Sequence, residues 1–577
     1  MAHERIVLAG VGAAQGIAFW LLIENWPKER GVGALFAGLL TFLSVATVVS
    51  HFAWTGRSYG RLLALACGTA GVYSAVAFWV GRQLPSAGDA FQGDDQRVFT
   101  WIATSLTTLY VLGPFLQIYQ ASGRRRFPYQ ALFLHSWNNF FVALVGLLFV
   151  GSLWAVLGLW AALFGLVEVE FFSEFFSEEL FIYTVTGGAA GLGIGLGRES
   201  QRVIETLRGI TLAVFRILLP LTSFVALLFI ATLPFTRLDP LWGTGHASPI
   251  LLSWIALTVL FLNAVWQDGS GPPPYPRALI RLVEASIVSM VLYAIISVYG
   301  TSLRIGQHGL TPPRFYALLF GVILGLYAIG YAAAVLRRSP GWLAGIPGVN
   351  LVMALTLVAL GLLLHTPLLD PLSWSARSQF ARLAEGRTRA SDFDYGYLQF
   401  RLGRAGAARL AALEALEDHP EIASIREGIR TAREAASHFE WQRIHGPEIR
   451  PEDFTIYPPG SVWPGGLFDA IRRVSSAWVT PCHEGESCAV LPLNVDREAG
   501  DEYVVLLGTT GSAQLLAFLR DEMGAWRYLG EYQLADAAEE PDPVTIRDAI
   551  RQSRIETRPS LYSDLVIDGR RFHLVPR

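Results

Sequence analysis

The polar side chains best suited for chemistry lie together in an otherwise apolar segment of the chain. His135, Asn138 and Asn139 fall within a stretch from Ala131 to Leu166 that contains no Asp, Glu, Lys or Arg. Imidazole and carboxamide groups donate and accept hydrogen bonds, so these three residues would line a polar pocket that binds a ligand. The alternative is that they bond neighbouring helices, as polar groups in membrane helices commonly do.

A second group of candidate residues lies in the segment 299–316. Arg304 and Arg314 would hold a phosphate or a carboxylate through paired N–H groups. The alternative is that one or both arginines pair with acidic loops nearby. Thr311 is placed to cap the helix that follows, whose first turn accommodates two prolines. We therefore take Arg304, Thr311 and Arg314 as candidate ligand-binding residues.

Residues typical of catalytic and ion-coupled sites are scarce. The sequence contains no His-Glu-x-x-His motif and no phosphate loop. Its apolar stretches lack carboxylates near their centres, where an ion-coupled transporter needs them, and Glu284 lies within a turn of the end of its stretch. We therefore expect no cofactor and no metal site, and the sequence favours a protein that is not an enzyme. Asn263 and Asn350 are expected to bond between helices.

Two cysteines, Cys482 and Cys488, enclose a short polar loop in the C-terminal part, whereas Cys67 lies in an apolar stretch. Outside the cytoplasm, the oxidising surroundings favour a disulfide between two such thiols. A metal site formed by both thiols and His483 is the alternative. We expect the disulfide.

Eleven apolar stretches within the first 365 residues must position these side chains. A helix needs about 20 apolar residues to cross a bilayer, and only helices and closed barrels satisfy their backbone groups in lipid. The sequence therefore predicts a mainly α, polytopic transmembrane bundle over residues 1–365. Its expected spans are Ile6–Ile23, Val32–Trp54, Leu62–Val80, Val98–Tyr119, Ala131–Leu166, Phe181–Leu196, Ile217–Phe235, Ile250–Trp266, Val283–Tyr299, Phe315–Val335 and Val349–Leu364.

The charges between the stretches predict the orientation, because Arg and Lys are retained on the cytoplasmic side. Alternate loops carry arginine, and the loops between them are acidic or nearly uncharged. The arginine loops hold Arg57 and Arg61; Arg124, Arg125 and Arg126; Arg198, Arg202, Arg208 and Arg216; Arg277 and Arg281; and Arg337 and Arg338. We expect a bacterial inner-membrane protein with a cytoplasmic N-terminus and, after an odd number of spans, a periplasmic C-terminal domain. A single lysine, Lys28, among many arginines is typical of a GC-rich bacterial genome.

Three segments of the membrane part allow more than one interpretation. Residues 131–166 would reach about 54 Å as one helix, whereas two spans broken near Gly151 would reverse the charge pattern twice, so we expect one helix. Residues 198–216 would form either an amphipathic helix on the cytoplasmic surface or an extension of the next span. The glycines of residues 187–193 would form a helix-packing face.

The C-terminal part, residues 366–577, is predicted to be a soluble α+β domain. Residues 366–480 show mainly helical patterns, with helices expected at 376–383, 393–416, 421–437 and 467–478. Residues 481–577 show the patterns of strands and are expected to form an antiparallel meander.

Three motifs resemble those of one protein family. They are Gly309-Leu310-Thr311 followed by Arg314-Phe315-Tyr316, the group Trp137-Asn138-Asn139, and the helix end Leu159–Phe164. They are similar to domain-of-unknown-function family 4153, a family of multi-pass bacterial membrane proteins, over roughly residues 130–400. The resemblance implies an architecture and carries no known activity.

These features favour an envelope platform that presents a periplasmic domain to a protein partner or to lipid-linked material. One alternative is an outer-leaflet enzyme that acts on a lipid-linked headgroup through Arg304 and Arg314. Another is a transporter or channel. The expected partners are membrane lipids and a periplasmic or membrane protein, and a net charge of −3 gives no reason to expect nucleic acid.

Overall fold

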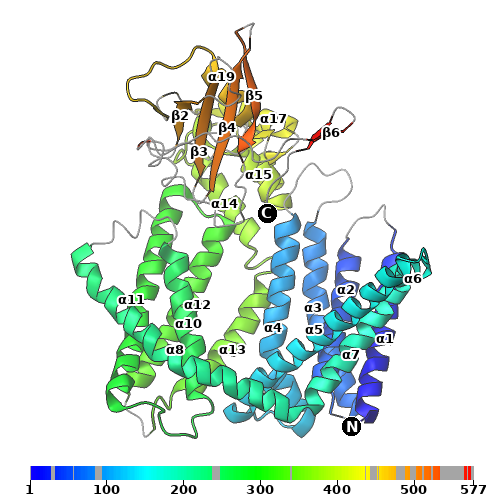
Figure 1. Ribbon diagram of the computed structural model, residues 1–577. Coiled ribbons are helices and arrows are strands. Elements are labelled where there is room, and N and C mark those ends of the chain that lie inside the picture. The colour runs from blue at the N-terminus through cyan, green and yellow to red at the C-terminus, as the bar shows by residue number, and fades with distance from the viewer. Residues whose placement is uncertain are drawn as a thin grey trace. The chain divides into compact units, whose positions relative to one another are not determined.

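The computed structural model describes most of the chain, and Figure 1 shows the path of its helices and strands. The described residues are 2–27, 33–55, 58–84, 94–236, 247–337, 341–435, 437–438, 440–441, 451, 454–475, 488–493, 502–509, 512–521, 524–532, 551, 565–567 and 570–572. The chain divides into two compact units, residues 1–429 and 430–577, which are described separately below.

The first unit is built on helices that are long and apolar enough to cross a membrane. The described residues contain eleven of them, which confirms the predicted polytopic bundle. They are α1 (Ala2–Glu24), α2 (Ala34–Ala53), α3 (Tyr59–Gln83), α4 (Asp94–Ser122), α5 (Tyr129–Gly165), α7 (Glu179–Glu199), α8 (Gln201–Thr236), α10 (Ala247–Trp266), α11 (Arg277–His308), α12 (Pro312–Leu336) and α13 (Ile346–Leu363).

Helices α5 and α8 settle two of the open alternatives. Helix α5 is a single helix of 37 residues, so the break considered near Gly151 does not occur. Helix α8 has 36 residues, with Pro220 and Pro234 inside it, and runs obliquely to the helices beside it in Figure 1. The segment after Arg198 therefore extends the next span and does not form a separate helix. A short aromatic helix, α6 (Phe171–Ser177), follows α5.

Glycines bring α1 and α7 into backbone contact. A Cβ atom added to Gly12 would overlap the carbonyl oxygen of Gly187, and one added to Gly187 would overlap that of Gly12. On another face of α7, a Cβ atom on Gly193 would lie 2.9 Å from the Cα atom of Gly146 in α5. Small residues allow such close approach of helices in lipid. The prediction that the glycine run is a packing face is confirmed.

Four polar side chains form a closed network inside the first unit. Asn350 of α13 donates to the Tyr129 hydroxyl at 2.7 Å and to Asn263 Oδ1 at 2.5 Å, and it accepts from the Tyr331 hydroxyl at 2.5 Å. Asn263 Nδ2 in turn donates to the Tyr331 hydroxyl at 2.8 Å. Asn263 and Asn350 therefore bond between helices, as expected, and the network ties α5, α10, α12 and α13 together.

Five shorter elements follow the last span. They are α14 (Pro371–Ala384), a 3-10 helix (Ala390–Asp392), α15 (Tyr395–Arg401), α16 (Gly403–Glu414) and α17 (Ile422–Glu434). The sequence predicted one helix over 393–416, and this prediction was wrong. Gly403 adopts a φ of +55°, a left-handed conformation that interrupts the helix after Leu402. Within the first unit, which extends to residue 429, α14 packs on α12 and α16 packs on α14 and α15.

The second unit contains a five-stranded sheet in the order β1 (Thr455–Ile456), β2 (Ala489–Pro492), β3 (Glu502–Thr509), β4 (Ser512–Arg520) and β5 (Trp526–Tyr532). Strands β2 to β5 pair in antiparallel fashion, which confirms the predicted meander, whereas β1 pairs with β2 in parallel and was not predicted. Helix α19 (Leu467–Ser475) buries Leu467 and Ile471 in one core with Val505 and Phe518. A separate hairpin comprises β6 (Leu565–Ile567) and β7 (Arg570–Phe572).

The predicted disulfide involves one residue outside the described part of the chain. Cys482 is not among the described residues, and Cys488, which precedes β2, is fully buried. The pairing of Cys482 with Cys488 therefore stays a prediction. Cys67 is a free, exposed cysteine on α3.

Candidate functional site

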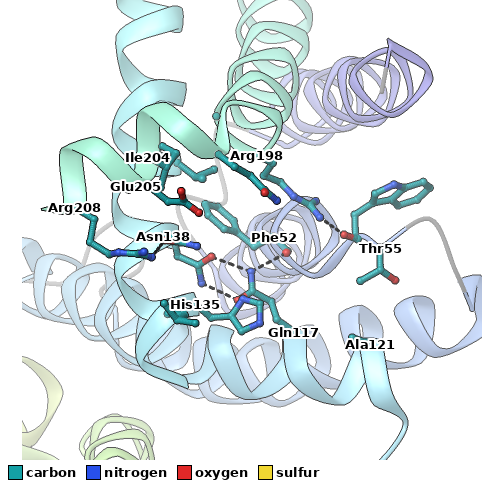
Figure 2. A pocket seen from close by; sticks show the side chains of 16 residues that line it. Phe52, Thr55, Gln117, Ala121, His135, Asn138, Arg198, Ile204, Glu205 and Arg208 are labelled. Carbon is teal, nitrogen blue, oxygen red and sulfur yellow. Dashed lines mark hydrogen bonds between the residues drawn. The ribbon is translucent and has the colours of Figure 1, made fainter. Parts of the chain in front are cut away.

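A cavity of about 510 Å³ lies where α2 and α4 end and where α5 and α8 begin, and Figure 2 shows its lining from close by. The three polar residues singled out in the sequence, His135, Asn138 and Asn139, all contribute to this lining. The other lining residues are Phe52, Trp54, Thr55, Gln117, Ala121, Leu134, Val142, Gly197, Arg198, Gln201, Ile204, Glu205 and Arg208. The structure thus brings the predicted polar group together with two arginines.

An amide pair forms the floor that joins α4 to α5. Gln117 Nε2 donates to Asn139 Oδ1 at 2.9 Å, and Asn139 Nδ2 donates to Gln117 Oε1 at 3.0 Å. Gln117 also donates to the Phe52 carbonyl oxygen at 2.9 Å (Figure 2). Asn139 is buried. Its amide is therefore used between helices, in agreement with the structural alternative considered for it.

Arg198 closes the end of α2. Its Nη1 donates to the His51 carbonyl oxygen at 2.9 Å, and its Nη2 donates to the carbonyl oxygen of Trp54. Carbonyl groups at the C-terminal end of a helix lack partners within the helix and attract positive charge. Arg198 thus fixes the junction of α7 and α8 against α2, and its guanidinium forms one wall of the cavity.

Arg208 of α8 points toward Asn138 of α5, as Figure 2 shows. Its Nη1 donates to Asn138 Oδ1 at 2.7 Å. Arg208 lies four residues after Ile204 and four before Leu212, and both of these side chains are buried. Residues at this spacing share one face of a helix. Arg208 is therefore a charged residue on the inward face of α8.

His135 and Glu205 complete the ionisable groups of the cavity, together with the two arginines. The cavity thus combines two guanidinium groups, one carboxylate and one imidazole with the amides of Gln117, Asn138 and Gln201. Guanidinium and amide groups are donors suited to the oxygen atoms of an anion.

A second cavity of about 780 Å³ shares Glu205 and Arg208 with the first. It lies between α8 and the segment 265–274, where Arg216 Nη2 donates to the Pro274 carbonyl oxygen at 2.9 Å. In the same segment, hydrogen bonds from Ser270 lower the pKa of Asp268. Helix α8 therefore forms a wall between two polar cavities, with Arg208 facing both.

The group at Arg304, Thr311 and Arg314 lies elsewhere. Helix α11 begins beside the second cavity and ends at His308, so these residues lie at its far end. Arg314 Nη1 donates to the Gly309 carbonyl oxygen at 2.9 Å and to that of His308 at 3.4 Å. Arg314 thus closes the end of α11, which the sequence did not predict.

Thr311 does not act as the sequence suggested. It is the N-cap residue of α12, and the two prolines occupy the first turn, but its side chain accepts no capping hydrogen bond. Instead, α14 reaches this loop: Gln379 Nε2 donates to the Leu310 carbonyl oxygen at 3.0 Å, and Arg382 Nη1 donates to that of Gly306 at 2.9 Å. The predicted Thr311 cap is corrected, because the contacts that the structure provides for this loop come from α14 and Arg314.

Residues 56–60 match the pattern Gly-x-Ser-x-Gly, which was not recognised in the sequence. In hydrolases this pattern forms a sharp turn between a strand and a helix. Here Ser58 lies between two helices, as the N-cap residue of α3 with a φ of 54°. Its carbonyl oxygen accepts a hydrogen bond from Gln120 Nε2 at 3.3 Å. Ser58 therefore lies at the start of a helix and not in the strand-to-helix turn that holds the nucleophile of a hydrolase.

Within the described residues no group of three or more His, Cys, Asp or Glu side chains is arranged to hold a metal ion. The sequence was used to assign Arg198 and Arg208 to the orientation and to a possible amphipathic helix, and it did not place them in a site. The spacing of Arg208 from Ile204 and Leu212, four residues on either side, could have indicated that Arg208 shares their inward helical face.

Comparison with known proteins identifies the family of the chain. A family model described as "Domain of unknown function (DUF4153)" matches residues 32–413, which include both cavities and the loop around Thr311. Neither the comparison with curated proteins nor that with solved structures gave a match. Because the family model covers well over half of the sequence, the chain belongs to the DUF4153 family of proteins.

Proposed function

We propose that this multi-pass membrane protein is an envelope platform of the bacterial inner membrane. In this proposal the N-terminus is cytoplasmic, and the C-terminal unit is presented in the periplasm to a protein partner or to lipid-linked material. The observation that carries the proposal is an odd number of spans, eleven among the described residues, combined with arginine in alternate loops. Arginine-rich loops remain on the cytoplasmic side.

The cavity beside α8 fits this orientation. The ends of the bundle where α4 stops and α5 starts carry Arg124, Arg125 and Arg126, and Arg198 and Arg208 lie beside the same helix ends. Positive charge concentrated at one end of a bundle favours the side of the membrane that faces the cytoplasm. The proposed platform would thus have a polar cavity on its cytoplasmic side.

The outer-leaflet enzyme proposed as an alternative gains less support. It relied on Arg304 and Arg314 to hold a headgroup, but Arg314 already donates to two carbonyl oxygens at the end of α11. A transporter would use the two cavities along α8 as part of a hydrated path. We retain it as the second candidate because Arg208 lines both cavities.

The orientation is tested with paired reporters. We expect alkaline phosphatase fused after Arg577 to be active and a fluorescent protein, which folds only in the cytoplasm, to be dark there. A matched pair of fusions after Gly123, in the first loop with three arginines, should behave in the opposite way. A fluorescent C-terminal fusion would overturn the proposed orientation.

The platform function is tested with a photo-crosslinking amino acid. Val462 is 87% exposed in the second unit and is a suitable position, and Arg125 serves as the control at the other predicted side. We expect a reproducible crosslink to one protein or to lipid-linked material from position 462 and none to the same molecule from position 125. Substrate flux in proteoliposomes without any such crosslink would favour the transporter instead.

A further inference from the structure

We propose that the cavity between α5 and α8 binds a phosphoryl anion, either the phosphodiester of a lipid headgroup or a soluble phosphate compound. This inference deepens the proposed function. The proposed orientation decides only the side of the membrane from which the ligand would reach the cavity. Its basis is the position of Arg208 and Arg198 in one cavity beside uncharged hydrogen-bonding groups.

The first argument is the inward position of Arg208. The exposed side of α8 carries an apolar stripe made of Val203, Leu207, Ile210, Val214 and Ile217, which are between 36% and 75% exposed. The opposite side carries Ile204 and Leu212, 3% and 7% exposed, with Arg208 between them. Arg208 therefore lies on the face of α8 that packs against α5, where its guanidinium meets Asn138, and away from the exposed apolar stripe.

The second argument is the balance of charge. Two guanidinium groups and one carboxylate, Glu205, line the cavity. Arg208 bonds the neutral amide of Asn138 at 2.7 Å, and Arg198 bonds two neutral carbonyl groups. These hydrogen bonds thus orient both guanidinium groups through neutral acceptors. The lining alone has one excess positive charge, and Glu4, outside the lining, also interacts electrostatically with Arg198. Arg208 is therefore the guanidinium that would attract a monoanion into this partly enclosed cavity.

The third argument is the geometry of the donors. A guanidinium carries five N–H donors, and the hydrogen bonds described above use one from Arg208 and two from Arg198. Tetrahedral phosphoryl groups suit arginine because two oxygens accept from the same guanidinium plane. His135, Gln201 and Gln117 add imidazole and amide groups to the same lining. A volume of about 510 Å³ accommodates a headgroup or a small phosphate ester.

Leu134, an apolar residue of the cavity lining that is 43% exposed, offers a surface for acyl chains beside the polar groups. A lipid would place its chains along Leu134 and its phosphodiester toward Arg208, whereas a soluble phosphate would use the cavity alone. Both ligands share the phosphoryl oxygens that the arginines recognise. The experiment below separates the two sources.

The decisive variant is Asn138→Asp in the full chain. It preserves the size of the side chain and an acceptor for Arg208 while it adds a negative charge that cancels the excess positive charge. Arg208→Gln removes the charge directly. Arg202→Gln is the matched control, because Arg202 is exposed on the same helix and does not line the cavity.

The readouts are native mass spectrometry of the purified protein with added phosphatidylglycerol or diacylglycerol of the same chains, and thermal stability with added inorganic phosphate. We expect the wild type and Arg202→Gln to retain phosphatidylglycerol over diacylglycerol by about tenfold or more, because a hydrogen bond to a charged group contributes at least about this factor. Asn138→Asp and Arg208→Gln should lose that preference. This result identifies a lipid headgroup.

Stabilisation of the wild type by phosphate, lost in Asn138→Asp without any lipid preference, would instead identify a soluble phosphate ligand and would also support the site. The proposal would be overturned if Asn138→Asp kept the same lipid preference and the same stabilisation by phosphate as the wild type. It would also be overturned if Arg202→Gln lost them to the same extent as Asn138→Asp. If Arg208→Gln does not fold, Asn138→Asp decides alone. Failure of the reporter test would change the side of the membrane and leave these outcomes unaffected.

Discussion

Arg97 and Asp370 face each other through two pairs of atoms, each separated by 3.3 Å, although they are 273 positions apart in the sequence. Their side chains are only 6% and 1% exposed. Arg97 lies near the start of α4 and also rests over the ring of Trp79, 5.6 Å from its centre. Asp370 caps α14 through the Leu372 N–H at 3.3 Å. This ion pair therefore joins the start of α4 to the helix that follows the last span.

We predict that Asp370→Asn destabilises the protein by about 3–5 kcal/mol, because removal of one partner of a buried pair leaves the other charge uncompensated. Asparagine retains the capping ability, so loss of the cap does not explain the effect. Denaturant unfolding in detergent measures it. Asp392→Asn is the control, because Asp392 pairs with Arg389 on the exposed surface and should matter little.

The double variant Arg97→Met with Asp370→Asn tests the cause. Removing both charges should restore a large part of the stability, since a buried pair replaced by neutral groups is often tolerated. A double variant no more stable than the single one would mean that the effect does not arise from an unpaired charge.

We predict that Gly187→Ala weakens the contact between α1 and α7 by about 1–3 kcal/mol, because the added methyl group must push the α1 backbone away. The neighbouring Gly188→Ala is a matched control, since its Cβ would lie 3.7 Å from the nearest atoms, an ordinary contact. Thermal unfolding of both variants measures the difference. Similar melting temperatures for the two variants would show that α1 and α7 accommodate the added methyl group without loss of stability.

The polar network at Asn350 makes a third prediction. Asn350→Ala removes three hydrogen bonds, and bonds between membrane helices contribute on average about 0.6 kcal/mol each, so a loss of about 2 kcal/mol is expected. Asn25→Ala removes the same amide from an exposed helix end and should have little effect. Equal stability of the Asn350→Ala variant and the wild type would exclude a stabilising role of the network.

The loop between α11 and α12 gives a fourth prediction. Arg314→Ala should cost about 1 kcal/mol, because the Gly309 carbonyl oxygen loses its hydrogen bond at 2.9 Å, whereas that of His308 still accepts from Gln379. Thr311→Ala should cost clearly less, because the Thr311 side chain accepts no capping bond. Melting temperatures of the two variants decide the order. The reverse order would restore Thr311 as the residue that starts α12.

The fifth prediction concerns the cysteines of the C-terminal unit. We predict that Cys482 and Cys488 are joined, which would stabilise the unit by roughly 2 kcal/mol in the chain-entropy account. Intact mass after alkylation, with and without reductant, measures the pairing. Alkylation of all three thiols in the unreduced protein under denaturing conditions would contradict it, because Cys67, a free thiol, should be the one that reacts if the pair is joined.

The membrane part was predictable because the bilayer leaves few solutions to an apolar chain. The eleven spans, the unbroken α5 and the glycine face of α7 follow from length, charge and residue size. The break at Gly403 escaped notice, because a single glycine on an otherwise helical pattern does not reveal its φ angle. The parallel partner β1 was missed because a strand of two residues has no visible alternation.

The site was predictable only in part. The polar residues at 135, 138 and 139 stood out because their surroundings are apolar. Their charged neighbours did not, because Arg198 and Arg208 lie in a segment where arginine already has a topological reason to occur. Only the packing of α8 on α5 distinguishes the inward Arg208 from the exposed Arg202. Thr311 was predicted to cap α12 from its residue type, but its side chain accepts no capping hydrogen bond in the structure.

The ring of Tyr129, Asn263, Tyr331 and Asn350 also bears on how the protein is assembled. A chain synthesised from its N-terminus delivers Tyr129 with the fifth span and Asn350 only with the eleventh. Until α13 arrives, the earlier members lack the residue to which all three of them bond. The ring therefore closes only when the last span is in place, and a chain that stops before it lacks three of the ring's hydrogen bonds.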